Sequence, residues 1–522
     1  MSVNNINNIP DIPSEKFKFA TGRDLKHDSK FDTKPVSYFQ GAFRRFCKNK
    51  GAVVGGIVIM CLLLFAIAAP FFTPFTPAYY DMVYSYVTPK SKLFVDKGID
   101  FWDGCKTKKT NYLGYIKDVA IAQETGRDVI KRGEYTVSED SASYFYRYDT
   151  YYGVGFGKYK IISQEEFDKI QAYQNETGRQ VIYPVVKSTD RPTLEKNKYD
   201  ANIYYKMEDP KASTVRPKLD SDGKIIPNYW KYSKDDASSL IPEYNSLRIE
   251  GENGIVENGT TYYYAYGRKV DGGIEVRAEY YEYYIYSHTQ VKKDGIEEPL
   301  FIFGTTETGK DIFACLSYGA RFSFVFATIV VAVTFIVGVI WGCISGYFGG
   351  IVDIVIMRIA DMMISFPGVI LAIAIAGIMG GSLINAMIAL TAVPWTKYAR
   401  LSRSMVLKIK RREFVDAAVV SGGSAAHILW VHILPNILPL MVITAAADIG
   451  AMMMELAGLS FLGFGSQPPA PEWGLMLNEG RQQLQTAPWL MFFPGLSIFI
   501  TVVVFNLWGD SLRDVLDPRN EG

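Results

Sequence analysis

The stretch GAVVGGIVIMCLLLFAIAAPFF, residues 51 to 72, decides the class of fold to which this chain belongs. It contains no charged side chain, and about 20 apolar residues are enough to cross the hydrocarbon core of a bilayer. Because that core offers no water to the peptide groups, such a stretch must satisfy its backbone hydrogen bonds internally, as a helix. The sequence therefore predicts a membrane-spanning helix close to the N-terminus.

Further apolar blocks follow in the second half of the chain of 522 residues, and they predict six spanning helices in all. One block opens with Asp353, Arg358 and Asp361. Lipid does not accept such charges, so part of that helix should lie at an interface or face protein. The five later blocks are residues 322 to 348, 353 to 380, 383 to 403, 435 to 465 and 489 to 508.

A polar segment, residues 78 to 300, separates the first block from the others and contains no window that could cross a membrane. Its residues 261 to 286 are rich in aromatic and β-branched side chains on both sides of Asp-Gly-Gly, which predicts strand, turn and strand. A helix is expected at residues 163 to 175. ETGRDVI (124 to 130) and ETGRQVI (176 to 182) resemble each other, either as a duplicated supersecondary unit or by chance. We therefore expect an inserted β-rich α+β domain.

The distribution of Lys and Arg predicts the orientation of the helices. Basic residues gather in the first 50 residues and again between residues 397 and 412, whereas the loop from 466 to 488 has Arg481 alone. Both termini should then be cytoplasmic and the polar segment extracellular. The predicted divisions are a cytoplasmic tail (1 to 50), a first transmembrane helix (51 to 77), an extracellular inserted domain (78 to 300), a five-helix transmembrane core (301 to 510) with a cytoplasmic loop (404 to 436), and a cytoplasmic C-terminal tail (511 to 522).

Charge and cysteine usage exclude several other classes of protein. The formal net charge is only +1, so nothing indicates a nucleic-acid partner. The basic first 50 residues are too long and too polar for a cleaved signal peptide. The cysteines show neither CxxC nor metal-ligand spacing, which argues against a metal site or an ectodomain held by disulfides; they are Cys47, Cys61, Cys105, Cys315 and Cys343.

The segment EFVDAAVVSGGSAAHILWVHILPN, residues 413 to 436, is the most informative part of the cytoplasmic loop. A short helix with small side chains begins near Asp416, turns at Gly422, and continues as a second amphipathic turn to Pro435. Such a helix can seat in a groove of a partner protein. Without further information it could equally be an ordinary loop that re-enters the membrane.

The spacing of this segment resembles the EAA loop of permease subunits of ATP-binding-cassette importers, which reads Glu-Ala-Ala, three residues, Gly, nine residues, Ile-x-Leu-Pro. Asp416 replaces Glu and His432 replaces Ile, and the ending HILPN resembles the peptide-transporter branch. The resemblance implies a role in coupling to an ATPase for the matching positions, which are Asp416, Ala417, Ala418, Gly422, His432, Leu434 and Pro435.

Other stretches of the second half are similar to the C-type membrane subunit of dipeptide and oligopeptide importers: 318 to 324, 346 to 367, 459 to 474 and 506 to 518. The 78 to 300 insertion does not belong to that pattern. The resemblance implies an α-helical polytopic membrane protein with the type I importer permease fold, in the plasma membrane of a bacterium. It further implies no catalysis and no cofactor in this chain, with ATP and Mg bound by partner subunits.

The partners implied by the family are a homologous second permease subunit, two cytosolic ATPases, an extracellular substrate-binding lipoprotein, membrane lipid and a peptide substrate. A nickel chelate or an oligosaccharide is the alternative substrate. The insertion could contact the lipoprotein, shield the channel mouth or contact the cell wall, and the first is our hypothesis. A sensing receptor would need a larger cytoplasmic output module, and an ion-coupled transporter usually shows internal repeats and broken helices.

Two carboxylates, Asp448 and Glu455, are seven residues apart in the fifth block and share one helical face. They are candidate pore or gate residues, or else a structural pair with a neighbouring helix or subunit. GTTETGKD (304 to 311) is close to a P-loop, but Asp311 replaces the hydroxyl residue that binds Mg²⁺. The tyrosines of the insertion could bind a peptide, or could serve as ordinary core residues.

Overall fold

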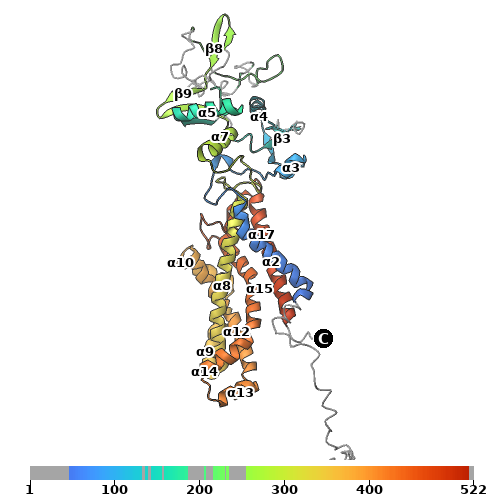
Figure 1. Ribbon diagram of the computed structural model, residues 1–522, viewed down its shortest axis with the longest axis vertical. Helices are drawn as coiled ribbons and strands as arrows, with labels where there is room; N and C mark the ends of the chain where they lie inside the picture. Colours follow the sequence, from blue (N-terminus) through green and yellow to red (C-terminus); the bar gives the residue numbers. More distant parts are fainter. Residues whose placement is uncertain are drawn as a thin grey trace, which may run out of the picture.

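The computed structural model has a bundle of long helices and, at one end of it, a smaller part built from short helices and strands (Figure 1). It describes residues 46–131, 136–138, 143–155, 158–185, 205–206, 208, 216–229, 231–233, 235 and 254–516. Most of the predicted N-terminal tail and residues 517–522 of the predicted C-terminal tail lie outside the described residues.

Four of the described helices are long and apolar enough to cross a membrane: Lys50–Phe71, Ile312–Phe348, Ala425–Phe461 and Trp489–Arg513. A fifth crossing is added if two helices that meet at 85° form one broken span. The elements concerned are α2 (Lys50–Ala68), η3 (Ala69–Phe71), α8 (Ile312–Phe348), α9 (Gly350–Ile364), α10 (Gly368–Met379), α15 (Leu434–Phe461) and α17 (Trp489–Leu516).

Two of the six predicted blocks are interrupted in the structure. The block at 353 to 380 breaks between α9 and α10 beside Pro367, and the block at 383 to 403 breaks at Pro394. That second break separates α11 (Leu383–Thr391) from α12 (Trp395–Ile409). Proline lacks the amide hydrogen that continues a helix, and its ring clashes with the preceding turn. The structure therefore differs from the sequence prediction, which took each block as one span.

A stripe of glycines brings α8 against α12. Gly338, Gly342 and Gly346 recur every four residues and so lie on one face of α8. A Cβ atom at Gly338 would lie 2.3 Å from the carbonyl oxygen of Trp395, and one at Gly342 would lie 1.9 Å from Ser402 Oγ. Small residues let two helix backbones approach closely in a membrane, so this stripe fixes the crossing of the two helices.

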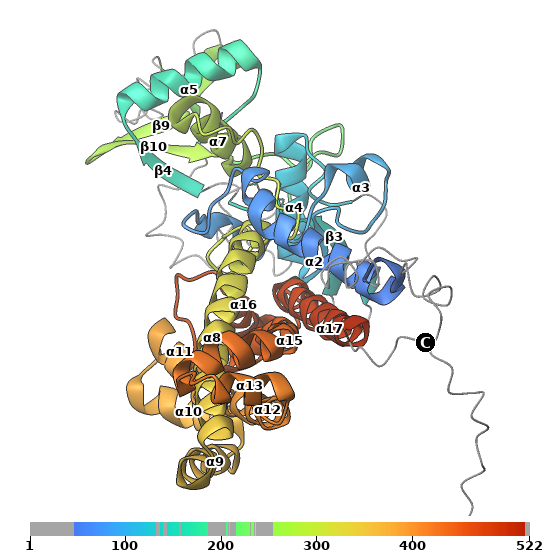
Figure 2. The same cartoon turned by 60° about the horizontal axis from the view of Figure 1, so that its bottom comes forward.

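The first helix packs beside the last one, and Figures 1 and 2 show α2 and α17 next to each other. The contact is again made through glycine, because a Cβ at Gly55 would lie 3.0 Å from Trp508 Cβ. Arg321 of α8 donates hydrogen bonds to the carbonyl oxygens of Ala66 (2.6 Å) and Ile67 (2.5 Å) at the end of α2. Carbonyls in the last turn of a helix have no partner within it, so Arg321 ties α2 to α8.

The described residues of the insertion form three small antiparallel sheets, with strand orders β1-β3-β2, β4-β10-β5 (with β9 beside β10) and β6-β8-β7. Short helices pack against the first two of these sheets. The strands are β1 (Cys105–Thr110), β2 (Thr136–Ser138), β3 (Ser143–Asp149), β4 (Lys158–Ile162), β5 (Ile182–Tyr183), β6 (Lys231–Tyr232), β7 (Ile255–Glu257), β8 (Thr260–Tyr264), β9 (Gly267–Val270) and β10 (Gly273–Ala278). The helices are α3 (Lys92–Asp96), α4 (Tyr112–Thr125), α5 (Gln164–Thr177) and α7 (Tyr280–Tyr286).

The predicted hairpin is partly right. Val270 pairs with Gly273 across the Asp-Gly turn, so β9 and β10 form the expected strands. The prediction of strand is wrong from Tyr280 onward, where the chain forms α7 instead. Glu279 caps this helix by accepting a hydrogen bond from the amide of Glu282. The helical form places two tyrosines on one face, toward the segment that follows α2, as the bonds Tyr280–Asp81 (2.7 Å) and Tyr284–Tyr79 (2.8 Å) show. The helix predicted at 163 to 175 is confirmed as α5.

The two ETGR segments belong to one structural unit that occurs twice, with an offset of 52 residues. In each unit a strand, β1 or β4, leads into a helix, α4 or α5. Asn111 and Ser163 occupy the same position and cap these helices through the amide three residues further on. Both helices end at a left-handed glycine, Gly126 with φ of 67° and Gly178 with φ of 70°.

The chain after each glycine pairs with the central strand of its sheet in the same way. The amide of Asp149 donates to the carbonyl of Val129, and the amide of Glu279 donates to that of Val181, each at 2.9 Å. The outer strands agree as well, since β1 pairs antiparallel with β3 as β4 does with β10. A chance likeness of seven letters would not reproduce caps, turn and pairing together. The segments therefore mark a duplicated supersecondary unit.

Candidate functional site: the helical hook before α15

The segment predicted to couple with an ATPase forms a compact hook at the end of the bundle opposite the insertion (Figure 1). It consists of α13 (Glu413–Val420), α14 (Ala425–His427) and the π-helical turn η6 (Ile428–Ile433), which runs directly into α15. Ser424 begins the second part, because its side chain accepts a hydrogen bond from the amide of His427 at 3.3 Å. The hook is therefore a helix, a turn and a helix, as the amphipathic pattern predicts.

Buried aliphatic side chains hold the hook against the bundle. Val415, Ile428 and Ile433 are each at most 2% exposed. They pack in one cluster with Val339 of α8 and Val406 of α12. Full burial of one such side chain stabilises a structure by about 1.5–3 kcal/mol. The hook is therefore packed directly against α8 and α12.

Gly422 makes the turn between the two parts. Its φ is +78°, in the left-handed region that favours glycine. The end of α13 is closed by hydrogen bonds from the amides of Gly422 to Val419 O (3.0 Å) and of Gly423 to Ala418 O (3.0 Å), the usual way of satisfying the last carbonyls of a helix. A Cβ at Gly422 would have no atom within 4 Å. The position is thus exposed and constrained in conformation.

The outward side of the hook is apolar although it lies on the surface of this chain. The exposed large side chains include Val420, which is 89% exposed, and Phe414, Val419, Trp430 and Val431. Asp416 and Ala417 lie in the same exposed helix. Several large apolar side chains exposed within one short segment are typical of a protein interaction site.

The remaining predicted coupling residues lie where η6 joins α15. His432 is half-buried, and its ring lies 5.7 Å from that of His427, edge to face. Leu434 is half-buried and Pro435 is exposed. Among the described residues, no group of three His, Cys, Asp or Glu side chains could hold a metal ion.

Ion pairs join α9 to α12 just inside the hook. Arg403 donates to both carboxylate oxygens of Asp353 at 2.5 Å, and Arg400 donates to Asp361 at 2.6 Å. The prediction that part of the 353 to 380 block faces protein is therefore confirmed. The sequence did not indicate the arginine partners, because they come from another helix, 39 and 50 residues further along the chain.

The two candidate pore carboxylates differ in their surroundings. Asp448, at the middle of α15, accepts hydrogen bonds from Lys397 Nζ (2.6 and 2.8 Å) and from the hydroxyl of Tyr398 (2.8 Å), both on α12. Glu455 is half-buried, and no hydrogen bond or ion pair joins it to the residues that the structure describes. Asp448 is thus paired with a neighbouring helix. Lys397, which the sequence assigned only to a basic stretch, is its partner.

The near match to a P-loop is a turn that leads into α8. Asp311 caps α8 by accepting a hydrogen bond from the amide of Ala314 at 2.9 Å. A Cβ at Gly309 would lie 1.8 Å from the carbonyl oxygen of Asp81, so the chain after α2 packs directly against this turn. The turn also lies at the end of the bundle that carries the insertion, away from the hook (Figure 1).

Most described tyrosines near α7 serve the internal structure of the insertion. Tyr84, Tyr151 and Tyr284 are buried in one cluster with Phe301. Other tyrosines line a hollow of about 360 Å³, among them Tyr205 and Tyr229. Tyr84, Tyr151 and Tyr284 are therefore core residues of the insertion. Peptide binding by the tyrosines stays a prediction.

Comparison with known proteins identifies the helical part of the chain. Residues 338–522 match the model of a family described as the inner membrane component of binding-protein-dependent transport systems. Residues 37–89 match a model described as the N-terminal transmembrane domain of oligopeptide transport permease C. A dipeptide transport system permease of Alkalihalophilus pseudofirmus is 45% identical over 217 residues, which are 42% of this chain and 71% of that protein. The chain belongs to this family.

Other relatives of this permease transport different solutes according to their names. A probable D,D-dipeptide permease of Escherichia coli is 41% identical over 220 residues, 42% of this chain and 74% of the relative. A nickel transport system permease of Escherichia coli is 42% identical over 218 residues, 41% and 78% of the two chains. A solved structure of the methionine transporter MetNI shares 18% identity with a TM-score of 0.30, and covers 38% of this permease and 97% of that chain.

Family membership confirms the importer permease predicted from the EAA-like spacing. The chain is a multi-pass membrane protein with the permease fold of this family, and it is a transport subunit of an ATP-binding-cassette importer. Neither family model extends over residues 90–337, which include most of the insertion.

Proposed function

We propose that this permease forms one half of the translocation path of a peptide importer and transmits the ATPase cycle through its helical hook. The observation that supports this most directly is the exposed apolar face of α13 and η6 above a buried cluster continuous with α8 and α12. In this proposal Asp416, Ala417 and Gly422 face a groove of a cytosolic ATPase, and His432, Leu434 and Pro435 join the hook to α15.

The proposed assembly contains a homologous second permease, two ATPases and an extracellular substrate-binding lipoprotein. ATP and Mg bind to the ATPases, and this chain holds no cofactor. ATP binding shifts the equilibrium between inward and outward openings only as far as it favours one of the two states. The buried cluster that links the hook to α8 and α12 would carry that preference into the bundle.

The proposed topology has six membrane crossings, as in a type I importer permease. It counts α9 with α10 as one broken crossing and α11 with α12 as another. Residues 78 to 300 are then extracellular, and both termini and the hook are cytoplasmic. The insertion and the hook lie at opposite ends of the bundle (Figure 1), which supports this arrangement.

Peptide is the proposed substrate because relatives at 41–45% identity are named as dipeptide permeases. A nickel chelate is the second candidate, since a nickel permease is 42% identical. Uptake of a labelled dipeptide by the reconstituted transporter, competed with unlabelled dipeptide or with a nickel chelate, would separate the two. Competition by the nickel chelate alone would count against the peptide proposal.

Crosslinking tests the docking of the hook. A cysteine at exposed Ala417, in a chain whose native cysteines are replaced, should crosslink to an ATPase subunit in intact membranes. A cysteine at Val256, in β7 of the insertion, serves as the control and should give no such crosslink. Crosslinking at Val256 but not at Ala417 would refute the proposed orientation.

A further inference from the structure

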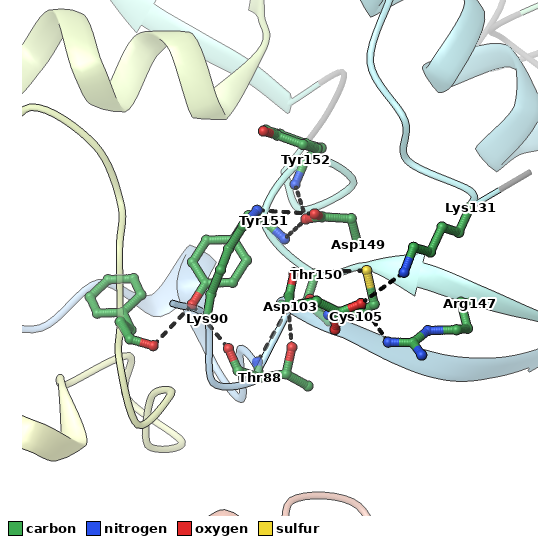
Figure 3. A network of polar contacts seen from close by, with 12 residues as sticks. Thr88, Lys90, Asp103, Cys105, Lys131, Arg147, Asp149, Thr150, Tyr151 and Tyr152 are labelled. Atoms are coloured by element: carbon green, nitrogen blue, oxygen red, sulfur yellow. Dashed lines mark hydrogen bonds and ion pairs between the residues drawn. The ribbon is translucent and has the colours of Figure 1, made fainter. Parts of the chain in front are cut away.

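A closed loop, residues 91 to 102, projects from the base of the insertion near the outer ends of α2 and α17. Its two ends are joined by a hydrogen bond from the amide of Ser91 to the carbonyl of Trp102 at 2.8 Å. Lys90 and Asp103 pair beside this bond. Figure 3 shows the polar residues that hold this base, with Lys90 directed to Asp149, and Lys131 and Arg147 directed to Asp103. The loop is therefore held firmly in place.

The inner side of the loop rests on the first turns of α17. The ring of Trp102 stacks on Phe493 with centroids 5.9 Å apart and lies 5.7 Å from Phe303. Phe303 in turn stacks on Phe493 at 4.1 Å. Trp489, the first residue of α17, donates its indole N–H to Thr305 O. These contacts place the loop at the level where α17 enters the apolar part of the bundle.

The outer side of the loop is apolar and uncovered. Leu93 is 60% exposed and Phe101 is 62% exposed, and Val95 and Ile99 are exposed as well. The charged residues Asp96 and Lys97 of the loop are also exposed, and Asp100 is directed to Lys131 and Arg147 at the base. Four exposed apolar residues within nine positions are unusual for a surface that faces water.

This apolar side continues an apolar surface of the bundle. Trp102 contacts Phe493, and the next residue, Phe492, is exposed along with Leu496 and Phe499 on α17. At the neighbouring end of α2, Phe71 and Phe72 are 80% and 83% exposed. The helices of a membrane permease expose such residues to lipid, and aromatic rings gather where the bilayer meets water.

We propose that the loop of residues 91 to 102 is a membrane anchor of the insertion, with Leu93, Val95, Ile99 and Phe101 inserted in the interfacial region of the bilayer beside α2 and α17. Apolar and aromatic side chains at this depth bind in proportion to their buried apolar area. The occupant of this surface is lipid, because the contact of Trp102 with Phe493 joins it to the apolar side chains that α17 exposes. The anchor would fix the height and tilt of the insertion above the mouth of the translocation path.

Lipid-specific quenching tests the anchor in the full chain. Single cysteines replace Leu93 or Val256 in a variant whose five native cysteines are substituted, and each carries an environment-sensitive fluorophore. Val256 is also an exposed apolar residue, at 69%, but it lies in β7, which pairs with β8 at the far end of the insertion (Figure 1). The chain is placed in nanodiscs of phosphatidylcholine with or without a spin label near the headgroup.

The spin-labelled lipid should lower the fluorescence of the Leu93 probe by roughly twofold and leave the Val256 probe unchanged, since only an interfacial probe meets the label. Equal fluorescence of the Leu93 probe in both lipids would overturn the proposal. The same measurement in the assembled transporter separates lipid from protein. Quenching that disappears when the second permease or the binding protein is present would show that a protein covers the loop instead. A Phe101→Cys probe repeats the test if the Leu93 variant fails to fold.

Discussion

Replacement of Gly422 by tryptophan tests the hook most sharply. The residue has φ of +78°, and a side chain in this left-handed region costs roughly 1–2 kcal/mol for a residue other than glycine. The structure shows no atom of this chain within 4 Å of the added Cβ, so the variant adds backbone strain without an internal clash. Its stability should fall by about 1–2 kcal/mol, and insertion in the membrane should continue.

The effect on transport should be much larger if an ATPase docks on this surface. A docking contact weakened by about 1.4 kcal/mol lowers affinity tenfold, and an indole placed in the interface should cost at least that much. We expect uptake of labelled peptide by proteoliposomes to fall roughly tenfold or more, and ATPase subunits to be lost on purification of the variant.

Gly178→Trp is the matched control for this variant. Gly178 ends α5 in the same left-handed conformation, with φ of +70°, and also has open space at its Cβ. It therefore carries the same backbone strain at the opposite end of the molecule, and its variant should transport normally. Gly422→Asn adds a second comparison, because asparagine tolerates this conformation better than other side chains. Normal uptake by Gly422→Trp would refute the docking role of the turn.

Three further predictions follow from individual contacts. Gly338→Leu should overpack the contact between α8 and α12 and lower the stability by about 1–3 kcal/mol. The measurement is the yield of folded protein in detergent, which should fall. Gly458→Leu is the control and should be tolerated, because a Cβ there meets nothing within 4 Å. Asp353→Asn removes the carboxylate held by Arg403 at 2.5 Å and should cost about 1–3 kcal/mol; an unchanged melting temperature would contradict this. Burial raises the pKa of the Glu279 carboxyl from 4.5 to about 7, against the opposing effect of Arg127. The folded insertion then binds this proton more tightly than the unfolded chain, so the stability contribution is full below about pH 4.5 and decreases as the pH rises to about 7, by roughly 3 kcal/mol. Glu279→Gln should flatten that part of the pH profile of thermal unfolding, and a slope equal to that of the wild type would exclude Glu279 as its source.

The repeated unit of the insertion could be suspected from the sequence but not established from it. The two ETGR segments alone leave chance and duplication open. The caps at Asn111 and Ser163 and the left-handed glycines after both helices decide between them. The capping residues and the glycines can be read from the sequence. That they do the same job in both copies became clear only when the strands beside them were seen paired in their sheets.

The segment from Tyr280 to Tyr286 shows the opposite case. Its aromatic residues suit a strand as well as a helix, and propensity favours the strand. The helix forms because Glu279 caps its first turn and because Tyr280 and Tyr284 together reach Asp81 and Tyr79. These partners lie some 200 residues earlier in the chain, and no periodicity within the segment could indicate them.

The sequence by itself determined that the chain is a membrane permease and where its hook lies. Long apolar runs and the spacing from Asp416 to Pro435 are properties of neighbouring residues, and bilayer physics leaves such runs little choice but to form helices. Only the tertiary structure decided that Asp448 meets Lys397, that Asp353 meets Arg403, and that the loop of residues 91 to 102 rests on α17. Each of these contacts depends on how helices cross and where the insertion sits, and that geometry results from packing among residues far apart in the chain.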